Sequence, residues 1–150
     1  MGQSLSNVLL HIIFSTKNRQ PFIDEVIEPE LYAYMTSIFT SCGSYVHKIG
    51  GVDDHIHIFC TLPRTLSISN LLEEIKKNSS KWIKTKGQKY HDFSWQKGFG
   101  ALSVSASLHN VLAGYIANQK KHHKKQTFQD EYREFLRLNN IPYDEKYVWD

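Results

Sequence analysis

Asp54-His55-Ile56-His57-Ile58-Phe59 is the stretch that decides the fold, because it predicts a strand with two chemically different faces. Side chains alternate along a strand, so the two histidines point one way and the aliphatic residues between them point the other. The aliphatic face is suited to a core. Because of the rise per residue in a strand, the two imidazoles lie about 7 Å apart or less. Such a pair can provide two ligands for a divalent metal ion. Because two ligands are too few for tight binding, we expect the chain to supply a third.

A second strand precedes the histidine strand and is joined to it by a short turn. Residues 44–49 predict this strand, and Gly50-Gly51 followed by Asp53 predicts the turn. The histidine strand then runs over residues 54–62, which makes the pair an antiparallel hairpin. Asp54 belongs by its residue type to the turn, and the alternative is that its carboxylate accepts a hydrogen bond from the ring N–H of one imidazole.

The remaining segments predict two further strands and four helices. Strands are indicated by alternation and β-branched residues, and helices by apolar residues at helical spacing. Pro29 marks an alternative start of the first helix, and Thr127 with Asp130 resembles a capping box that opens the last. The strands cover residues 6–16 and 100–105, and the helices cover residues 24–41, 67–86, 107–125 and 127–140.

The order of these elements is β-α-β-β-α-β followed by two helices, which is the order of a ferredoxin-like split sandwich. We therefore expect an α+β fold. Its antiparallel sheet carries helices on one face, and C-terminal helices that include Tyr115 complete it. The length of 150 residues fits one domain that spans residues 1–150.

Composition narrows the class of protein further. The net charge of +3 fits a nucleic-acid partner without requiring one. Cys42 and Cys60 stand in apolar contexts that do not resemble a disulfide framework, so a reducing cytoplasm is expected. The sequence has no basic and apolar leader and no apolar run of the roughly 18 to 20 residues that cross a membrane. We expect neither secretion nor membrane insertion.

Tyr115 and Gln119 are four residues apart in a predicted helix, so their side chains emerge on the same face. Glutamine can give a metal ion a neutral oxygen ligand, and tyrosine can act as a covalent nucleophile. If this face lies over the two histidines, the site holds two imidazoles, an amide oxygen and a phenol. That set of groups suits metal-assisted cleavage of a phosphodiester.

The same residues carry a resemblance to a known family. His55-Ile56-His57 resembles the His-hydrophobe-His motif of HUH endonucleases, and residues 115–119 resemble the Tyr-x-x-x-Gln helix of the small single-tyrosine HUH transposases of bacterial and archaeal insertion sequences. Residues 11–19, 95–100 and 143–147 are similar to further segments of that family. The resemblance covers nearly the whole chain, and REP-associated transposases are among the relatives.

The resemblance implies a mechanism and partners. His55, His57 and Gln119 would bind Mg²⁺ or Mn²⁺, and Tyr115 would form a 5′-phosphotyrosine bond with single-stranded DNA, leaving a free 3′-hydroxyl. Family members are homodimers that recognise hairpins near element ends. Many pair the tyrosine of one subunit with the histidines of the other. The resemblance gives no role to the acidic C-terminal tail.

Two groups of cations are candidates for binding the DNA backbone. Lys120, Lys121 and Lys124 follow the proposed nucleophile, and Lys17 and Arg19 follow the first strand. A solvated helix end, where cations are favoured by the helix dipole, is the alternative for the first group.

Two other function classes fit parts of the pattern. A ferredoxin-like sheet also occurs in non-catalytic modules that bind single-stranded nucleic acid, although the strand here carries histidines instead of a Gly-aromatic run. A metal-dependent hydrolase would use water as the nucleophile and leave Tyr115 as a bystander. A domesticated relative that processes chromosomal palindromes would keep the same residues as a mobile-element enzyme.

Overall fold

The sheet of the computed structural model has four antiparallel strands in the order β2-β3-β1-β4. The structure describes residues 2–122 and 125–150. The histidine strand β3 lies in the interior of the sheet, between β2 and β1. The strand bounds are β1 (Leu9–Ser15), β2 (Val46–Gly51), β3 (His55–Thr61) and β4 (Gly100–Ser103).

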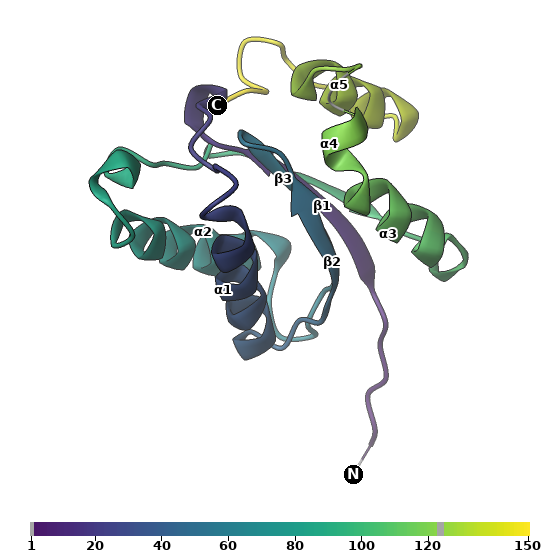
Figure 1. Cartoon of the computed structure of the whole chain (residues 1–150). Helices are drawn as coiled ribbons and strands as arrows, with labels where there is room; N and C mark the ends of the chain where they lie inside the picture. Colours follow the sequence, from purple (N-terminus) through teal and green to yellow (C-terminus); the bar gives the residue numbers. More distant parts are fainter. Residues whose placement is uncertain (1, 123–124) are drawn as a thin grey trace.

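Helices cover both faces of the sheet (Figure 1). One face carries α1 (Glu28–Ser41) and α2 (Ile68–Lys84). The other carries α3 (His109–Ala117), α4 (Gln119–His122) and α5 (Phe128–Leu138). Short 3-10 helices cover Lys17–Arg19, Gln88–Tyr90 and Ala106–Leu108. The predicted α+β fold with its order β-α-β-β-α-β is therefore confirmed, and Tyr115 lies on the C-terminal helices as expected.

The alternation of β3 separates the two faces of the sheet. Ile56 and Ile58 are fully buried in the main core beneath α1 and α2. His55 and His57 point to the opposite face, where Ile13 is the antiparallel neighbour of His57. On this face Ile13 packs against the apolar side of α5, formed by Phe128, Tyr132 and Leu136. The histidines thus lie under a second, smaller apolar layer.

Both capped helices begin where the sequence signals them. Ser67 precedes α2, and its hydroxyl accepts a hydrogen bond from the Asn70 amide at 3.0 Å. Thr127 does the same for α5 by accepting from the Asp130 amide at 3.2 Å. These bonds satisfy amide groups that have no partner within the first turn of a helix. The Thr127 cap fixes the residue from which α5 starts.

The expected turn at Gly50-Gly51 is wrong, because both glycines belong to β2 and the chain reverses over residues 52–54. A Cβ atom on Gly50 would lie 2.6 Å from the carbonyl oxygen of Ile116, and one on Gly51 would collide with the carbonyl oxygen of His55. The two residues therefore permit close backbone approach. Gly50 in particular lets α3 lie directly against β2.

The expected helix over residues 107–125 is also wrong, because it is divided at Asn118 into α3 and α4. The Asn118 side-chain amide donates to the carbonyl of Gly114 at 2.9 Å, and the backbone amide of Asn118 donates to the same oxygen at 3.2 Å. A side chain that competes for a backbone carbonyl favours a helix end. Lys124, expected in this helix, lies outside the described residues.

Other bounds are shorter than the patterns indicate. Asp24 does not begin α1. Its carboxylate accepts hydrogen bonds from the amides of Val26 and Ile27 in a turn that precedes the helix. The helix instead starts near Pro29, which was the alternative start. The first and last strands end earlier than expected because 3-10 turns follow them. In the part of the chain that the structure describes, no helix is both long and apolar enough to cross a membrane.

The C-terminal tail lies against the end of β1. The carbonyl of Asp150 accepts hydrogen bonds from the Gly98 amide at 2.8 Å and from Nε2 of Gln96 at 3.3 Å. The Oε1 atom of Gln96 in turn accepts from the Ser15 amide at 2.8 Å. A chain of hydrogen bonds therefore joins the tail to the strand beside His55.

Candidate active site

The sequence-predicted site residues come from three elements and meet on one face of the sheet. His55 and His57 project from β3, Tyr115 from α3, and Gln119 from the first turn of α4. The Nε2 atom of His55 lies 3.3 Å from Oε1 of Gln119, and the rings of His57 and Tyr115 lie 5.9 Å apart at their centroids. The structure therefore brings these four side chains together.

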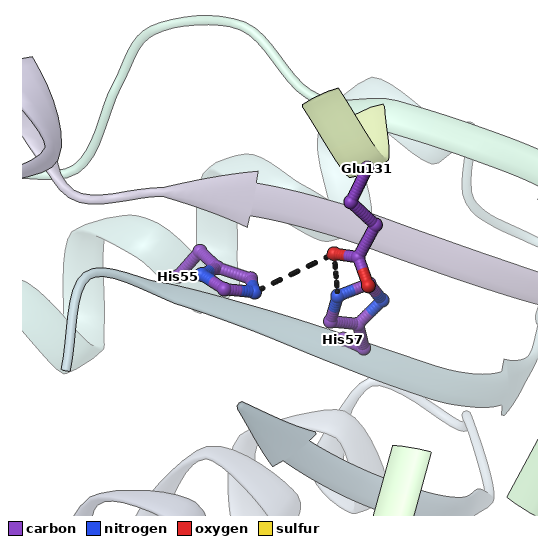
Figure 2. A group of neighbouring side chains, drawn as sticks. All are labelled: His55, His57 and Glu131. Atoms are coloured by element: carbon purple, nitrogen blue, oxygen red, sulfur yellow. Dashed lines mark hydrogen bonds and ion pairs between the residues drawn. The ribbon is translucent and has the colours of Figure 1, made fainter. Parts of the chain in front are cut away.

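Glu131 joins this group and was not found from the sequence. It projects from α5, is 2% exposed, and points its carboxylate at both histidines (Figure 2). Its Oε1 atom lies 2.9 Å from Nε2 of His57 and 3.6 Å from Nε2 of His55. Its Oε2 atom accepts a hydrogen bond from the Tyr115 hydroxyl and one from Nε2 of Gln119 at 3.4 Å. A signal existed, since Glu131 interrupts the apolar side of α5 beside Tyr132.

The other ring nitrogen of each histidine also has a partner. The Nδ1 atom of His55 lies 2.7 Å from Oδ1 of Asp54, so Asp54 holds the ring in addition to standing in the turn. The Nδ1 atom of His57 lies 2.8 Å from Nε2 of His11 on β1. Burial, with the neighbouring His57, lowers the pKa of His11 to about 3, so this ring is neutral at pH 7. Such partners fix which nitrogen of a histidine faces a metal ion.

The donor atoms of the site fit one divalent cation. One ligand atom from each of His55, His57 and Glu131 lies within 4.8 Å of the others, and Gln119 adds an amide oxygen. Six ligands at the 2.0–2.1 Å preferred by Mg²⁺ stand about 2.9 Å apart at adjacent positions. The distances of 2.9, 3.3 and 3.6 Å between donors here are close to that value. Nitrogen and oxygen donors in this mixture suit Mn²⁺ as well.

Tyr115 is half-buried and stands between the donor atoms and an apolar groove. Burial and the hydrogen bond to Glu131 hold the pKa of Tyr115 well above its ordinary value of 10. The groove has a volume of about 280 Å³ and includes His11, Leu112 and Phe135 among its lining residues. The phenol is therefore protonated at neutral pH, and its ring is reachable from the groove.

The predicted DNA-binding cations lie at two places around the site. Lys17 and Arg19 belong to the 3-10 turn after β1, and Lys17 lines a pocket of about 280 Å³ together with Lys97 and Trp149. Lys120 and Lys121 belong to α4, where Lys120 forms an ion pair with Glu28 at 3.3 Å. Contact with DNA remains a prediction for all of them, including Lys124.

Comparisons with known proteins identify the family and the fold of the chain. The model of the family described as IS200-like transposases matches residues 4–119. No curated protein matches the chain significantly in sequence. Among solved structures, a Deinococcus radiodurans R1 protein described as a presumed transposase is similar with a TM-score of 0.62 and 19% identity, over 79% of this chain and 96% of that one.

A second similar structure is the REP-associated tyrosine transposase bound to a REP hairpin. Its TM-score is 0.61 at 15% identity, over 82% of this chain and 72% of that one. At these identities the two structures show a shared fold. The family model covers most of the sequence, including His55, His57, Tyr115 and Gln119. The chain belongs to the family of IS200-like transposases.

Proposed function

We propose that the protein cleaves and rejoins single-stranded DNA through a 5′-phosphotyrosine intermediate on Tyr115, with Mg²⁺ or Mn²⁺ held by His55, His57 and Gln119. The observation that carries this proposal is the link from the Tyr115 hydroxyl to Glu131, whose other oxygen is hydrogen-bonded to His57 and lies 3.6 Å from Nε2 of His55. The phenol and the donor atoms act on one phosphate group only if they lie this close together.

The reaction needs two transesterifications. In the first, the Tyr115 oxygen gives up its proton and bonds to phosphorus, the bond from phosphorus to the 3′-oxygen breaks, and that oxygen takes up a proton and leaves as a 3′-hydroxyl. In the second, a 3′-hydroxyl attacks the phosphotyrosine and releases Tyr115. The number of phosphodiester-type bonds is unchanged throughout, so no nucleotide triphosphate is consumed.

The residues of the chain have separate tasks in this scheme. His55, His57 and Gln119 would hold the ion, which when bound would supply a Lewis acid for a non-bridging phosphate oxygen. Asp54 and His11 keep the two imidazoles turned toward that position. Burial and the hydrogen bond to Glu131 raise the pKa of Tyr115, so the nucleophile enters the reaction as a protonated phenol.

The proposed substrate is single-stranded DNA with a hairpin, as at the ends of an insertion sequence. The similarity in fold to a transposase bound to a REP hairpin supports this choice. Lys17, Arg19, Lys120, Lys121 and Lys124 are proposed to contact its phosphates. We also propose that the protein acts in the cytoplasm as a homodimer. Within a single chain Tyr115 already lies beside the histidines of that same chain. If the purified protein sediments as a monomer at micromolar concentration, this result would argue against active sites that are shared between two subunits.

A denaturing gel tests the mechanism. Single-stranded oligonucleotides copied from the flanks of the gene are incubated with Mg²⁺ or Mn²⁺ and with wild type, Tyr115→Phe or His57→Ala, and an EDTA control is included. We expect a DNA–protein adduct that survives denaturant and is absent in both variants and with EDTA. Cleavage by Tyr115→Phe would instead indicate a hydrolase. Binding without cleavage by the wild type on any flanking hairpin would indicate a binding module.

A further inference from the structure

Glu131 lies outside the segment that the family model matches, yet its carboxylate stands at the centre of the site. The match covers residues 4–119 and contains both histidines, the tyrosine and the glutamine. Glu131 comes from α5, which begins only after that segment has ended. Its place in the site is set by the packing of α5 on the sheet through Phe128, Tyr132 and Leu136.

The charge of a bound ion requires a buried anion here. Histidine and glutamine ligate as neutral groups, and His55, His57 and Gln119 are 0%, 0% and 1% exposed. A dication surrounded only by these groups would be shielded from water without a compensating charge, which is costly. Among the described residues Glu131 directs a carboxylate at the Nε2 side of both rings, whereas Asp54 is bonded to Nδ1 of His55.

The two oxygen atoms of Glu131 face different partners. Oε1 lies 2.9 and 3.6 Å from the two Nε2 atoms, which are the nitrogens that the site offers to an ion. Oε2 accepts the Tyr115 hydroxyl. A carboxylate in this position can ligate through one oxygen and hold the nucleophile with the other, which fixes the distance between the ion and the phenol.

We propose that Glu131 is a ligand of the divalent ion and that, through its second oxygen, it positions the Tyr115 hydroxyl. This inference rests on the proposed function, because it assigns a further ligand to the same site. It makes α5 part of the metal centre: the helix must be docked for the ligand set to be complete, and ion binding in turn holds α5 on the sheet.

Mn²⁺ binding to the full chain without DNA tests this assignment. Titrations followed by the EPR signal of unbound Mn²⁺ compare wild type with Glu131→Gln and Glu131→Ala. Glu134→Gln is the matched control, because Glu134 lies on the same helix and is exposed and paired with Arg137. His57→Ala reports loss of a proposed ligand. We expect Glu131→Gln to weaken binding at least about tenfold, since removing even the partners of metal ligands costs about 10- to 100-fold.

A second measurement separates a ligand from a merely structural residue. Hydrogen exchange of α5 amides is measured with and without Mn²⁺. We expect the ion to slow exchange in wild type and Glu134→Gln but not in Glu131→Gln. The glutamine variant keeps the size of the side chain and an oxygen that can accept the Tyr115 hydroxyl, so it tests the charge even if the alanine variant fails to fold.

The outcomes are distinguishable from those of the proposed function. Mn²⁺ affinity in Glu131→Gln within twofold of wild type overturns the inference, and tighter binding shows instead that the carboxylate blocks the ion position. Either result leaves adduct formation by the wild type untouched. Conversely, weakened Mn²⁺ binding in Glu131→Gln, with no adduct from wild type on any flanking hairpin, supports Glu131 as a ligand and refutes the transposition mechanism.

Discussion

The Nε2 atom of His11 lies 2.8 Å from Nδ1 of His57, and the two rings stack with centroids 5.1 Å apart. His11 lies on β1 and His57 on the neighbouring β3, so the contact depends on the pairing of these strands. It holds the His57 ring with Nε2 turned toward Glu131. The orientation of the His57 ring is therefore linked to a histidine on the neighbouring strand.

Replacing His11 by phenylalanine removes the nitrogen but keeps an aromatic ring beside Phe135. We expect Mn²⁺ affinity to fall about tenfold, because the His57 ring loses the partner that fixes its orientation. Calorimetric titration measures the affinity. The exposed His91 gives the control variant His91→Gln, which should bind as wild type does. Equal affinities for His11→Phe and wild type would show that packing alone orients His57.

Replacing Gly50 by alanine tests the close approach of α3 to β2. The new Cβ would meet the Ile116 carbonyl at 2.6 Å, so α3 must shift away. We expect a loss of about 1–3 kcal/mol in the free energy of unfolding, typical of overpacking, together with slower adduct formation because Tyr115 moves with its helix. Urea unfolding and the adduct assay measure the two effects.

Gly114→Ala is the matched control for that prediction. Gly114 is also on α3, and an added Cβ there meets nothing within 4 Å. Alanine should therefore leave the fold intact and raise helix stability by up to about 1 kcal/mol. If Gly50→Ala behaves like Gly114→Ala, the close contact with Ile116 is not a constraint on the position of Tyr115.

Binding of Mn²⁺ should stabilise the folded chain. At 100 times its dissociation constant a ligand adds about 2.7 kcal/mol, which raises the unfolding midpoint of a chain of this size by about 5–10 °C. Differential scanning fluorimetry measures the shift with Mn²⁺ and with EDTA. We expect His57→Ala to lose it and His91→Ala to keep it. A similar rise in His57→Ala would place the bound ion elsewhere.

Acid should weaken the attachment of α3. Burial and the neighbouring His109 lower the pKa of His47, and the two rings contact each other at 3.1 Å between nitrogens. Because the unfolded chain binds a proton more readily than folded His47, stability is full above the ordinary pKa of 6.5 and falls as the pH drops below it. Urea unfolding at pH 7.5 and 5.5 should show a smaller fall for His47→Gln than for wild type and His91→Gln.

The salt dependence of DNA binding reports how many phosphates the protein neutralises. Removing one cation that binds a phosphate should reduce the slope of log affinity against log salt by roughly 0.7 for single-stranded DNA. We expect Lys17→Gln with Arg19→Gln to lower the slope by about one to two in fluorescence anisotropy with a hairpin oligonucleotide. Lys81→Gln, on α2 and the opposite side of the sheet, is the control. An unchanged slope would remove both cations from the DNA path.

Strand alternation and helical spacing were sufficient to predict how the site residues that are close together in the sequence are arranged. Alternation alone predicts that His55 and His57 share a face, and a spacing of four predicts that Tyr115 and Gln119 do. Tyr115 and Gln119 share a face even though the helix is divided at Asn118, because α4 begins at Gln119 and the Gln119 side chain is buried.

The rest depends on contacts between distant segments. Glu131 reaches the histidines only because the apolar side of α5 packs on the sheet, and His11 reaches His57 only because β1 pairs with β3. A sequence pattern within one segment cannot predict that Glu131 lies close to the histidines or that His11 lies close to His57. The glycine pair was misassigned for the same reason: what requires Gly50 is the carbonyl of Ile116, a residue 66 positions further along the chain.

The hydrogen bonds of Asp150 bear on how the protein should be handled. Its carbonyl is bound to Gly98 and Gln96, and Gln96 is bound to Ser15 beside the histidine strand. Residues of an affinity tag joined after Asp150 would attach directly beside these bonds, which lead through Gln96 to the strand that pairs with the histidine strand. Residues 2–8 are exposed and far from it (Figure 1). Protein purified with an N-terminal tag is therefore the appropriate material for metal and DNA measurements.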